Sequence, residues 1–229
     1  MSRPSGLSRR QWLLWAAAGL PVGAKAGQTP AERRWKSDLD AFADADQLWP
    51  PPAGCLLFIG SSTIRMWNGL EWAFPAVPQV VKRGFGGGRL ADCADLVPRL
   101  VLPYEPRQVV LYAGDNDLSE GASPQAVVGH CARFVQQTRT GLPGVPIAFV
   151  SVKPSPSRLG ILPAVRETNA LLRQWATQTP GFEVIDVFTP MVDAGGLPRR
   201  ELFLPDMLHL NAAGYALWQS VISPHLRTT

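Results

Sequence analysis

The sequence is poor in the residues that bind metal ions and form disulfide bonds. Its 229 residues include three histidines and three cysteines. It contains neither a Cys-x-x-Cys pair nor a His-Glu-x-x-His run, so a zinc site has no support. The cysteines, at positions 55, 93 and 131, are expected to be buried and reduced. A disulfide between Cys93 and Cys131 is left open, because spacing alone does not determine pairing.

Signature motifs of several enzyme classes are also missing. There is no Gly-x-Ser-x-Gly nucleophile elbow, which argues against an ordinary α/β-hydrolase, and no Ser-x-x-Lys pair of the β-lactamase type. The glycines within 84–88 lack the Gly-x-Gly-x-x-Gly spacing of dinucleotide-binding proteins, and no Walker motif occurs. These absences argue against the α/β-hydrolase, β-lactamase and nucleotide-binding classes.

The basic charge of the chain comes from its first residues. The formal net charge is +4, which by itself would indicate an anionic partner. Residues 1–26 hold four of the 22 basic residues and no acidic one, so 18 basic and 18 acidic residues remain in the rest of the chain. That remainder is neutral overall, and we expect no nucleic-acid partner.

The same first residues have the pattern of an export signal. Two arginines at 9–10 precede a short apolar run at 12–22, and Ala-Lys-Ala at 24–26 offers small residues for cleavage. We predict a twin-arginine-type signal peptide at 1–26 of a bacterial protein that is periplasmic or secreted. The apolar run is shorter than the roughly 20 residues that span a bilayer, so no stable membrane insertion is expected after cleavage.

Strand-like and helix-like segments alternate along the rest of the chain. The expected strands are 55–59, 79–83, 108–113, 146–152 and 182–187, and the expected helices are 89–101, 124–140, 161–178 and 212–222. Such alternation predicts a parallel sheet with helices on both faces. An earlier helix-like segment ends before the prolines at 50–52. We therefore expect an N-terminal helical extension at 27–49 and a single domain at 50–229.

Residues with catalytic potential follow three of the expected strands. Ser61 and Ser62 follow the first, glycines 86–88 the second and Asn116 the third. Ligands of open α/β sheets bind at the carboxyl ends of the strands. A serine there can act as a nucleophile, glycines can expose backbone N–H groups, and an asparagine amide can stabilise an oxyanion. Taken singly, these residues are more typical of helix caps and turns.

The fourth candidate is the segment 206–209, Asp-Met-Leu-His, just before the last expected helix. A hydrolytic serine needs an imidazole, and the imidazole needs an acceptor that fixes its tautomer. His209 has a carboxylate three residues upstream, whereas His130 lies on an expected amphipathic helix and His225 near the C-terminus. Asn211 is expected to cap the last helix and so hold His209 in the adjoining loop.

In this order, the four segments resemble the SGNH hydrolases, the GDSL-like esterase superfamily. The resemblance extends from about Pro50 to Trp218, and its blocks are Gly60-Ser61-Ser62, Gly86-Gly87-Gly88, Gly114-Asp115-Asn116-Asp117 and Asp206-Met207-Leu208-His209, with Lys153-Pro154-Ser155-Pro156 before the last. It implies a flavodoxin-like three-layer α/β/α sandwich with a central five-stranded parallel sheet.

The resemblance also implies the roles of the site residues. The triad would be Ser62, His209 and Asp206. The oxyanion hole would consist of the backbone N–H groups of Ser62 and Gly87 and the side-chain amide of Asn116. No metal or organic cofactor is required for this chemistry. The expected function is a serine esterase that hydrolyses short-chain acyl esters, above all acetyl esters, of small molecules or carbohydrates.

Ser61 departs from the family pattern, which has aspartate before the nucleophile. By position in the motif the nucleophile remains Ser62, and the change bears on the geometry of the turn more than on activity. Two alternatives stay open. A catalytically silent ligand-binding relative would keep the fold, and a cell-envelope O-acyltransferase would pass the acyl group to a sugar or glycan instead of water. The oligomeric state is not predicted.

Overall fold

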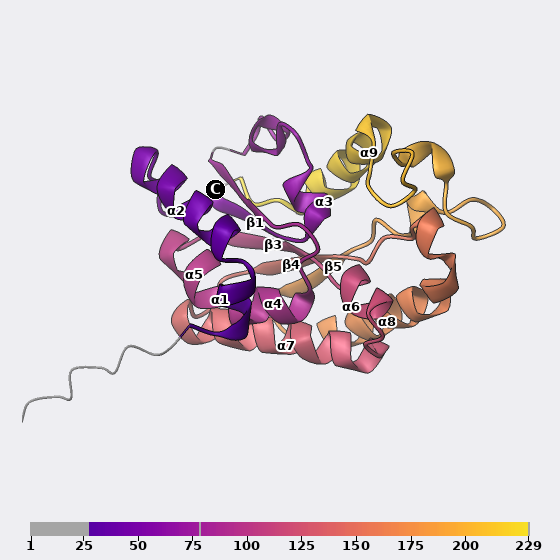
Figure 1. The fold of residues 1–229 in the computed structure, drawn as a ribbon, viewed down its shortest axis with the longest axis horizontal. Coiled ribbons are helices and arrows are strands. Elements are labelled where there is room, and N and C mark those ends of the chain that lie inside the picture. Colours follow the sequence, from indigo (N-terminus) through magenta and orange to yellow (C-terminus); the bar gives the residue numbers. More distant parts are fainter. Residues whose placement is uncertain (1–27, 78, 229) are drawn as a thin grey trace, which may run out of the picture.

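A five-stranded parallel sheet forms the centre of the part of the chain that the structure, a computed structural model, describes: residues 28–77 and 79–228 (Figure 1). The strands are β1 (Leu56–Gly60), β2 (Val80–Gly84), β3 (Gln108–Tyr112), β4 (Ile147–Val150) and β5 (Phe182–Ile185). Their order in the sheet is β2-β1-β3-β4-β5, and all neighbours are parallel. This is the flavodoxin-like, doubly wound order. The predicted signal peptide at 1–26 lies outside the described residues.

Helices cover both faces of this sheet. They are α1 (Pro30–Arg34), α2 (Lys36–Leu48), α3 (Ser62–Arg65), α4 (Leu90–Asp95), α5 (Val97–Leu100), α6 (Asp115–Ser119), α7 (Pro124–Gly141), α8 (Leu162–Ala176) and α9 (Ala212–Ile222). In Figure 1, α3 and α9 lie above the sheet, and α4, α5, α7 and α8 lie below it. The three-layer α/β/α sandwich expected from the sequence is confirmed.

The predicted elements overlap the observed ones, but two predicted helices are each divided in two, and the first of these, predicted at 30–46, forms α1 and α2 with a break at Trp35. Every predicted strand overlaps an observed strand, and the last helix has the predicted bounds. Asn211 caps that helix, because its Oδ1 accepts a hydrogen bond from the Gly214 N–H at 3.1 Å. The single helix predicted at 89–101 is wrong, since the chain forms α4 and α5 with a break at Leu96. Pro98 explains the break, because proline has no N–H to donate to the preceding turn.

Side chains of alternate strand residues fill two separate cores. On β1, Leu57 and Ile59 join the core beneath the sheet, while Leu56 and Phe58 pack on the opposite face with Trp218 of α9. Each of these side chains is fully buried. Burying one such side chain contributes about 1.5–3 kcal/mol. This two-sided burial explains why the strands read as continuous apolar runs.

The helices that precede residue 50 pack against the sheet domain. The Trp35 ring, between α1 and α2, lies with its centroid 5.0 Å from that of Phe85. Arg83 on β2 donates from Nε to the Tyr104 hydroxyl at 2.7 Å and forms an ion pair with Asp46 of α2. The Tyr104 hydroxyl in turn donates to the other oxygen of Asp46 at 2.6 Å. Apolar and charged contacts together fix the extension to the domain.

The three cysteines are buried and free, as predicted. Cys93 and Cys131 do not form the disulfide bond that the sequence left open. Burial raises the pKa of all three thiols, that of Cys55 to about 11. The cysteines therefore act as small apolar residues of the core.

Candidate active site

The candidate residues after the first three strands lie at one edge of the sheet. Ser62 opens α3 after β1, Gly87 lies in the loop after β2, and Asn116 lies in α6 after β3. Because β1 lies between β2 and β3, these loops meet where the chain connections change direction, which is the usual ligand crevice of such sheets. A Cβ at Gly60 would lie 1.9 Å from the Tyr112 carbonyl oxygen, so only glycine lets β1 and β3 approach this closely.

Ser62, His209 and Asp206 form an unbroken chain of hydrogen-bond contacts. His209 Nε2 lies 2.9 Å from Ser62 Oγ, and His209 Nδ1 lies 2.6 Å from Asp206 Oδ2. With its proton on Nδ1 and donated to the carboxylate, the imidazole leaves Nε2 free to accept the Ser62 hydroxyl proton. This is the geometry of a nucleophile, a base and a group that orients the base.

The loop that carries His209 is shaped by one oxygen of Asp206. Oδ1 accepts hydrogen bonds from the backbone N–H groups of Leu208 and His209, both at 2.9 Å. The Leu204 N–H donates to the His209 carbonyl at 2.8 Å and closes the loop. Met207 takes a left-handed φ of 57°, a conformation that is unfavourable for a residue with a side chain by about 1–2 kcal/mol. Asp206 thus builds the turn with one oxygen and faces the imidazole with the other.

These contacts lower the pKa of Asp206. Partial burial opposes ionisation, but the hydrogen bonds from the His209 ring and from the two backbone N–H groups outweigh it and bring the pKa to about 2. The carboxylate is therefore ionised at neutral pH, as an acceptor of the Nδ1 proton must be.

The adjacent serines have different surroundings. Ser61 is 1% exposed, and its Oγ has no hydrogen-bond partner among the described residues. Its N–H donates to the Tyr112 carbonyl at 3.0 Å. Ser62 is half-buried, and its Oγ contacts His209. Of the two hydroxyls, only that of Ser62 has a base and access to solvent.

Two backbone N–H groups in the loops after β1 and β2 are available to a ligand. Ser62 is the first residue of α3, so its N–H has no acceptor within the helix. No described residue accepts a hydrogen bond from this N–H or from that of Gly87. Gly87 has a φ of 73°, which glycine adopts without strain. Its loop packs on α3, since a Cβ at Gly86 would lie 3.0 Å from Arg65 Cζ.

The third candidate donor, Asn116, is held on two sides. Its side chain donates from Nδ2 to the Gly88 carbonyl at 3.0 Å and accepts at Oδ1 from Arg158 Nη2 at 2.8 Å. A carboxamide carries two N–H bonds, so one of them remains for a ligand. Asn116 is thereby tied both to the glycine loop and to the segment after β4.

Charged residues behind Asn116 were not identified from the sequence. Asp115 Oδ2 lies 3.0 Å from Lys153 Nζ and 3.0 Å from Arg158 Nη1, and we call these three residues the Asp115 cluster. The side chains of Asp115 and Lys153 are 6% and 1% exposed. Burial alone would raise the pKa of Asp115, but the two cations hold it below its ordinary value. In the sequence, Asp115 and Lys153 lie within the blocks that resemble the family pattern, but no spacing indicated that they and Arg158 meet.

The other two histidines have structural partners away from Ser62. His130 Nδ1 lies 3.3 Å from Asp117 Oδ1, and His225 Nδ1 lies 2.8 Å from Glu183 Oε2. Asp117 also accepts from the Leu90 N–H at 2.8 Å and so caps α4, the helix that follows the glycine loop. His209 alone among the three histidines faces a serine hydroxyl.

Comparison with known proteins agrees with this arrangement. Residues 58–217 match the model of the GDSL-like Lipase/Acylhydrolase family. The chain belongs to this family. It is accordingly an ester hydrolase, and the predicted family and enzyme class are confirmed. No curated protein matches the sequence of this family member.

Solved structures share the GDSL-family fold at low sequence identity. A Streptococcus pneumonia protein described as a platelet activating factor has a TM-score of 0.74 and 19% identity, over 85% of this chain and 94% of that one. A GDSL-like lipase from Bacteroides thetaiotaomicron has a TM-score of 0.70 and 19% identity, over 82% and 96%. A carbohydrate esterase family 3 protein from Talaromyces cellulolyticus has a TM-score of 0.59 and 18% identity, over 75% and 95%. Structural similarity at sequence identities this low shows that these proteins share the fold of this chain.

Two further features of this GDSL-family chain concern residues 28–77 and 79–228. None of the helices there combines the length and the apolar character needed to cross a membrane. Within the same residues, no group of three or more His, Cys, Asp or Glu side chains is placed to hold a metal ion.

Proposed function

We propose that this protein is a serine esterase that hydrolyses short-chain acyl esters, above all acetyl esters. The nucleophile is Ser62, the general base is His209, and Asp206 orients the imidazole. The observation that carries the proposal is the contact chain from Ser62 Oγ through His209 to Asp206, at 2.9 and 2.6 Å. Family membership supports ester hydrolysis in general, and this contact chain supports the assignment of roles.

Acylation follows from the protonation states of these groups. Ser62 Oγ attacks the ester carbonyl carbon while His209 Nε2 takes the hydroxyl proton. The carbonyl electrons move to its oxygen, and Asp206 stabilises the imidazolium that forms. When the tetrahedral intermediate collapses, the bond to the alcohol oxygen breaks, and His209 gives its proton to the leaving alcohol. The acyl group then remains on Ser62.

The negative oxygen of the intermediate meets three N–H donors in this proposal. These are the backbone N–H groups of Ser62 and Gly87, which have no other acceptor among the described residues, and the free N–H of Asn116. Removing one such donor typically lowers turnover about 10²- to 10³-fold. In deacylation, His209 removes a proton from water, the water oxygen attacks the acyl carbon, and the proton passes to Ser62 as the acid leaves.

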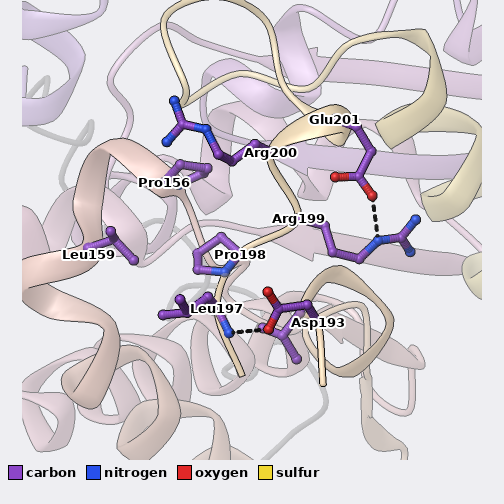
Figure 2. Close-up of a pocket in the computed structure, with 9 residues that line it drawn as sticks. Pro156, Leu159, Asp193, Leu197, Pro198, Arg199, Arg200 and Glu201 are labelled. Carbon is purple, nitrogen blue, oxygen red and sulfur yellow. Dashed lines mark hydrogen bonds and ion pairs between the residues drawn. The ribbon is translucent and has the colours of Figure 1, made fainter. Parts of the chain in front are cut away.

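In this proposal the alcohol part of the substrate occupies a pocket that neighbours the His209 loop, although no residue of the triad or of the oxyanion hole lines it. Figure 2 shows it between the segment that carries Pro156 and Leu159 and the loop at 193–201. Its volume is about 630 Å³, and its lining is Pro156, Leu159, Val192, Asp193, Leu197, Pro198, Arg199, Arg200 and Glu201. It adjoins the triad loop, because the Ser157 N–H donates to the Met207 carbonyl at 3.0 Å. Apolar walls with charged side chains suit a sugar better than a long acyl chain.

The test is the hydrolysis of p-nitrophenyl acetate by the purified wild type, Ser62→Ala and Ser61→Ala. We expect Ser62→Ala to lose turnover by about 10⁴-fold or more and Ser61→Ala to keep it, because only Ser62 contacts His209. An acetylated sugar should be a better substrate than a p-nitrophenyl ester of eight or more carbons. Equal rates for the wild type and Ser62→Ala would refute the proposal. Transfer to an added alcohol at the expense of hydrolysis would instead identify an acyltransferase.

A further inference from the structure

The Asp115 cluster lies directly behind the proposed oxyanion donor Asn116. Asp115 and Asn116 are consecutive residues at the start of α6. Arg158 reaches both of them, since its Nη2 donates to Asn116 Oδ1 at 2.8 Å and its Nη1 lies 3.0 Å from Asp115 Oδ2. The Arg158 side chain is 19% exposed, so most of it is withdrawn from water. One guanidinium therefore donates a hydrogen bond to the Asn116 carboxamide and forms an ion pair with the Asp115 carboxylate.

The two contacts of the Asn116 carboxamide select one of its two orientations. In the observed orientation its oxygen faces the guanidinium, which can only donate, and its nitrogen faces the Gly88 carbonyl, which can only accept. Rotation by 180° would bring donor against donor at Arg158 and acceptor against acceptor at Gly88. The observed orientation also leaves the second N–H of Asn116 without a partner among the described residues, as a donor to an oxyanion must be.

The backbone around Arg158 links the Asn116 side of the site to the loop that carries Asp206 and His209. Arg158 lies in the 3₁₀ segment Pro156–Ile161, where its φ of −121° departs from helical geometry. Its N–H donates to the Ser155 carbonyl at 2.9 Å, and the neighbouring Ser157 N–H donates to Met207, between Asp206 and His209. Before this segment, just after β4, the Asn169 side chain of α8 accepts from the Val152 N–H at 2.8 Å and donates to the Val152 carbonyl at 2.9 Å. These hydrogen bonds fix the backbone that carries the Arg158 side chain.

The fork of the guanidinium makes this role specific to arginine. One Nη group donates a hydrogen bond to Asn116 while the other forms an ion pair with Asp115, whereas an ammonium group supplies a point charge on a flexible stem. Lys153 does not duplicate this contact: its Nζ lies 3.0 Å from Asp115 Oδ2 and 3.3 Å from the Tyr112 hydroxyl, and among the described residues it has no hydrogen bond to Asn116.

We propose that Arg158 is the positioning residue of the oxyanion hole: it fixes the Asn116 carboxamide with its N–H toward the developing negative charge. The proposal rests on the proposed esterase function. Arg158 acts through Asn116, so its removal should affect the stabilisation of the transition state and leave substrate binding nearly unchanged.

The test is a double-mutant cycle on p-nitrophenyl acetate hydrolysis with Arg158→Ala, Asn116→Ala and the double variant. We expect Arg158→Ala to lower kcat on the order of 10- to 100-fold with KM changed less than about threefold, because a displaced donor fits the transition state poorly. In the Asn116→Ala background the same change should lower kcat less than about twofold, because the group that Arg158 positions is gone. Arg158→Lys should recover only part of the loss.

Arg133→Ala is the matched control, because it also removes an arginine whose guanidinium contacts two acceptors, but away from the site. Arg133 donates to Asp95 Oδ1 at 2.6 Å and to the Ala91 carbonyl at 3.0 Å, between α7 and α4. We expect it to change thermal stability and leave kcat unaltered. If Arg158→Ala does not fold, the cycle is run with Arg158→Lys and Arg158→Met, which keep an unbranched aliphatic stem in place of the arginine side chain.

The outcomes separate this proposal from the esterase assignment. An unchanged kcat for Arg158→Ala, or an equal fall with and without Asn116, overturns the positioning role while Ser62→Ala remains inactive. A wild type with no Ser62-dependent turnover overturns the esterase function, and the positioning role with it.

Discussion

The Asn116 side and the His209 side of the site differ in burial and in what holds them. Asn116 is 9% exposed, and the neighbouring Asp115 side chain is 6% exposed. Asp115 is held by the side chains of Lys153 and Arg158, and Asn116 by the Arg158 side chain and the Gly88 carbonyl. On the other side, the Asp206 and His209 side chains are 46% and 19% exposed. Their loop is closed by hydrogen bonds from backbone N–H groups.

This difference determines what each side loses when a residue is replaced. In the buried Asp115 cluster, removing one partner leaves another charge without compensation and away from water. Near Asp206, water can replace a lost contact, and the backbone hydrogen bonds keep the loop closed. We therefore expect replacements on the Asn116 side to lower both activity and stability, and replacements on the His209 side to lower mainly activity.

The largest expected effect is that of Asp206→Asn on turnover. The amide oxygen can still accept from Leu208 and His209 N–H groups, so the loop should keep its shape. Its NH₂ group would face His209 Nδ1 and favour the tautomer with the proton on Nε2, which cannot accept the Ser62 proton. We expect kcat to fall about 10³- to 10⁴-fold in steady-state assays. A fall of less than tenfold would show that Asp206 does not set the tautomer.

The pH dependence of stability gives a second measurement on the same variant. The pKa of Asp206 is about 2 in the folded protein, below the roughly 3.9 of an unfolded chain. Its stabilising contribution is therefore present above about pH 4 and is lost as the pH falls through 2, with roughly half remaining near pH 3. Denaturant unfolding should show a difference between wild type and Asp206→Asn that narrows from pH 7 to pH 3. A difference that widens over this range would contradict the assignment.

The next largest effect should be that of Lys153→Met on stability. Lys153 is 1% exposed, and methionine keeps its length but leaves Asp115 with Arg158 as its remaining cation. We expect the free energy of unfolding to fall by about 2–4 kcal/mol in urea titrations. The control is Lys36→Met, which breaks an ion pair with Asp40 whose side chains are 62% and 54% exposed and should change stability by less than about 0.5 kcal/mol. If both variants lowered the free energy of unfolding equally, burial of the Asp115 cluster would not explain its contribution to stability.

The smallest effect should be that of Ser61→Ala. The Ser61 hydroxyl is buried and has no partner among the described residues, so its removal breaks no hydrogen bond seen there. We expect stability within about 0.5 kcal/mol of the wild type, or slightly above it, and unchanged kcat. A loss of more than about 1 kcal/mol in thermal unfolding would mean that this hydroxyl has a partner in solution.

The sequence predicted one side of the site better than the other, and the reason is physical. Asp206 and His209 are three residues apart, and Ser62 follows an apolar strand, so order and spacing identify them. Arg158 meets Asn116 only because β3 and β4 are neighbours in the sheet, a contact 42 residues apart in the chain. No periodicity or spacing predicts such a tertiary contact.

The same limit applies to the fold. The strands were found from their apolar runs, and the last helix from its Asn211 cap, because these signals are local. The ion pair between Asp46 and Arg83 was not found, because it joins residues 37 positions apart on different elements.

The most direct test of the account is to locate the serine that becomes covalently modified. The protein would be treated with a fluorophosphonate, which phosphonylates an activated serine, then digested and analysed by tandem mass spectrometry. We predict one label, on Ser62, that disappears in His209→Ala and persists in Ser61→Ala. A label on Ser61, or none on an enzyme that turns over p-nitrophenyl acetate, would contradict it.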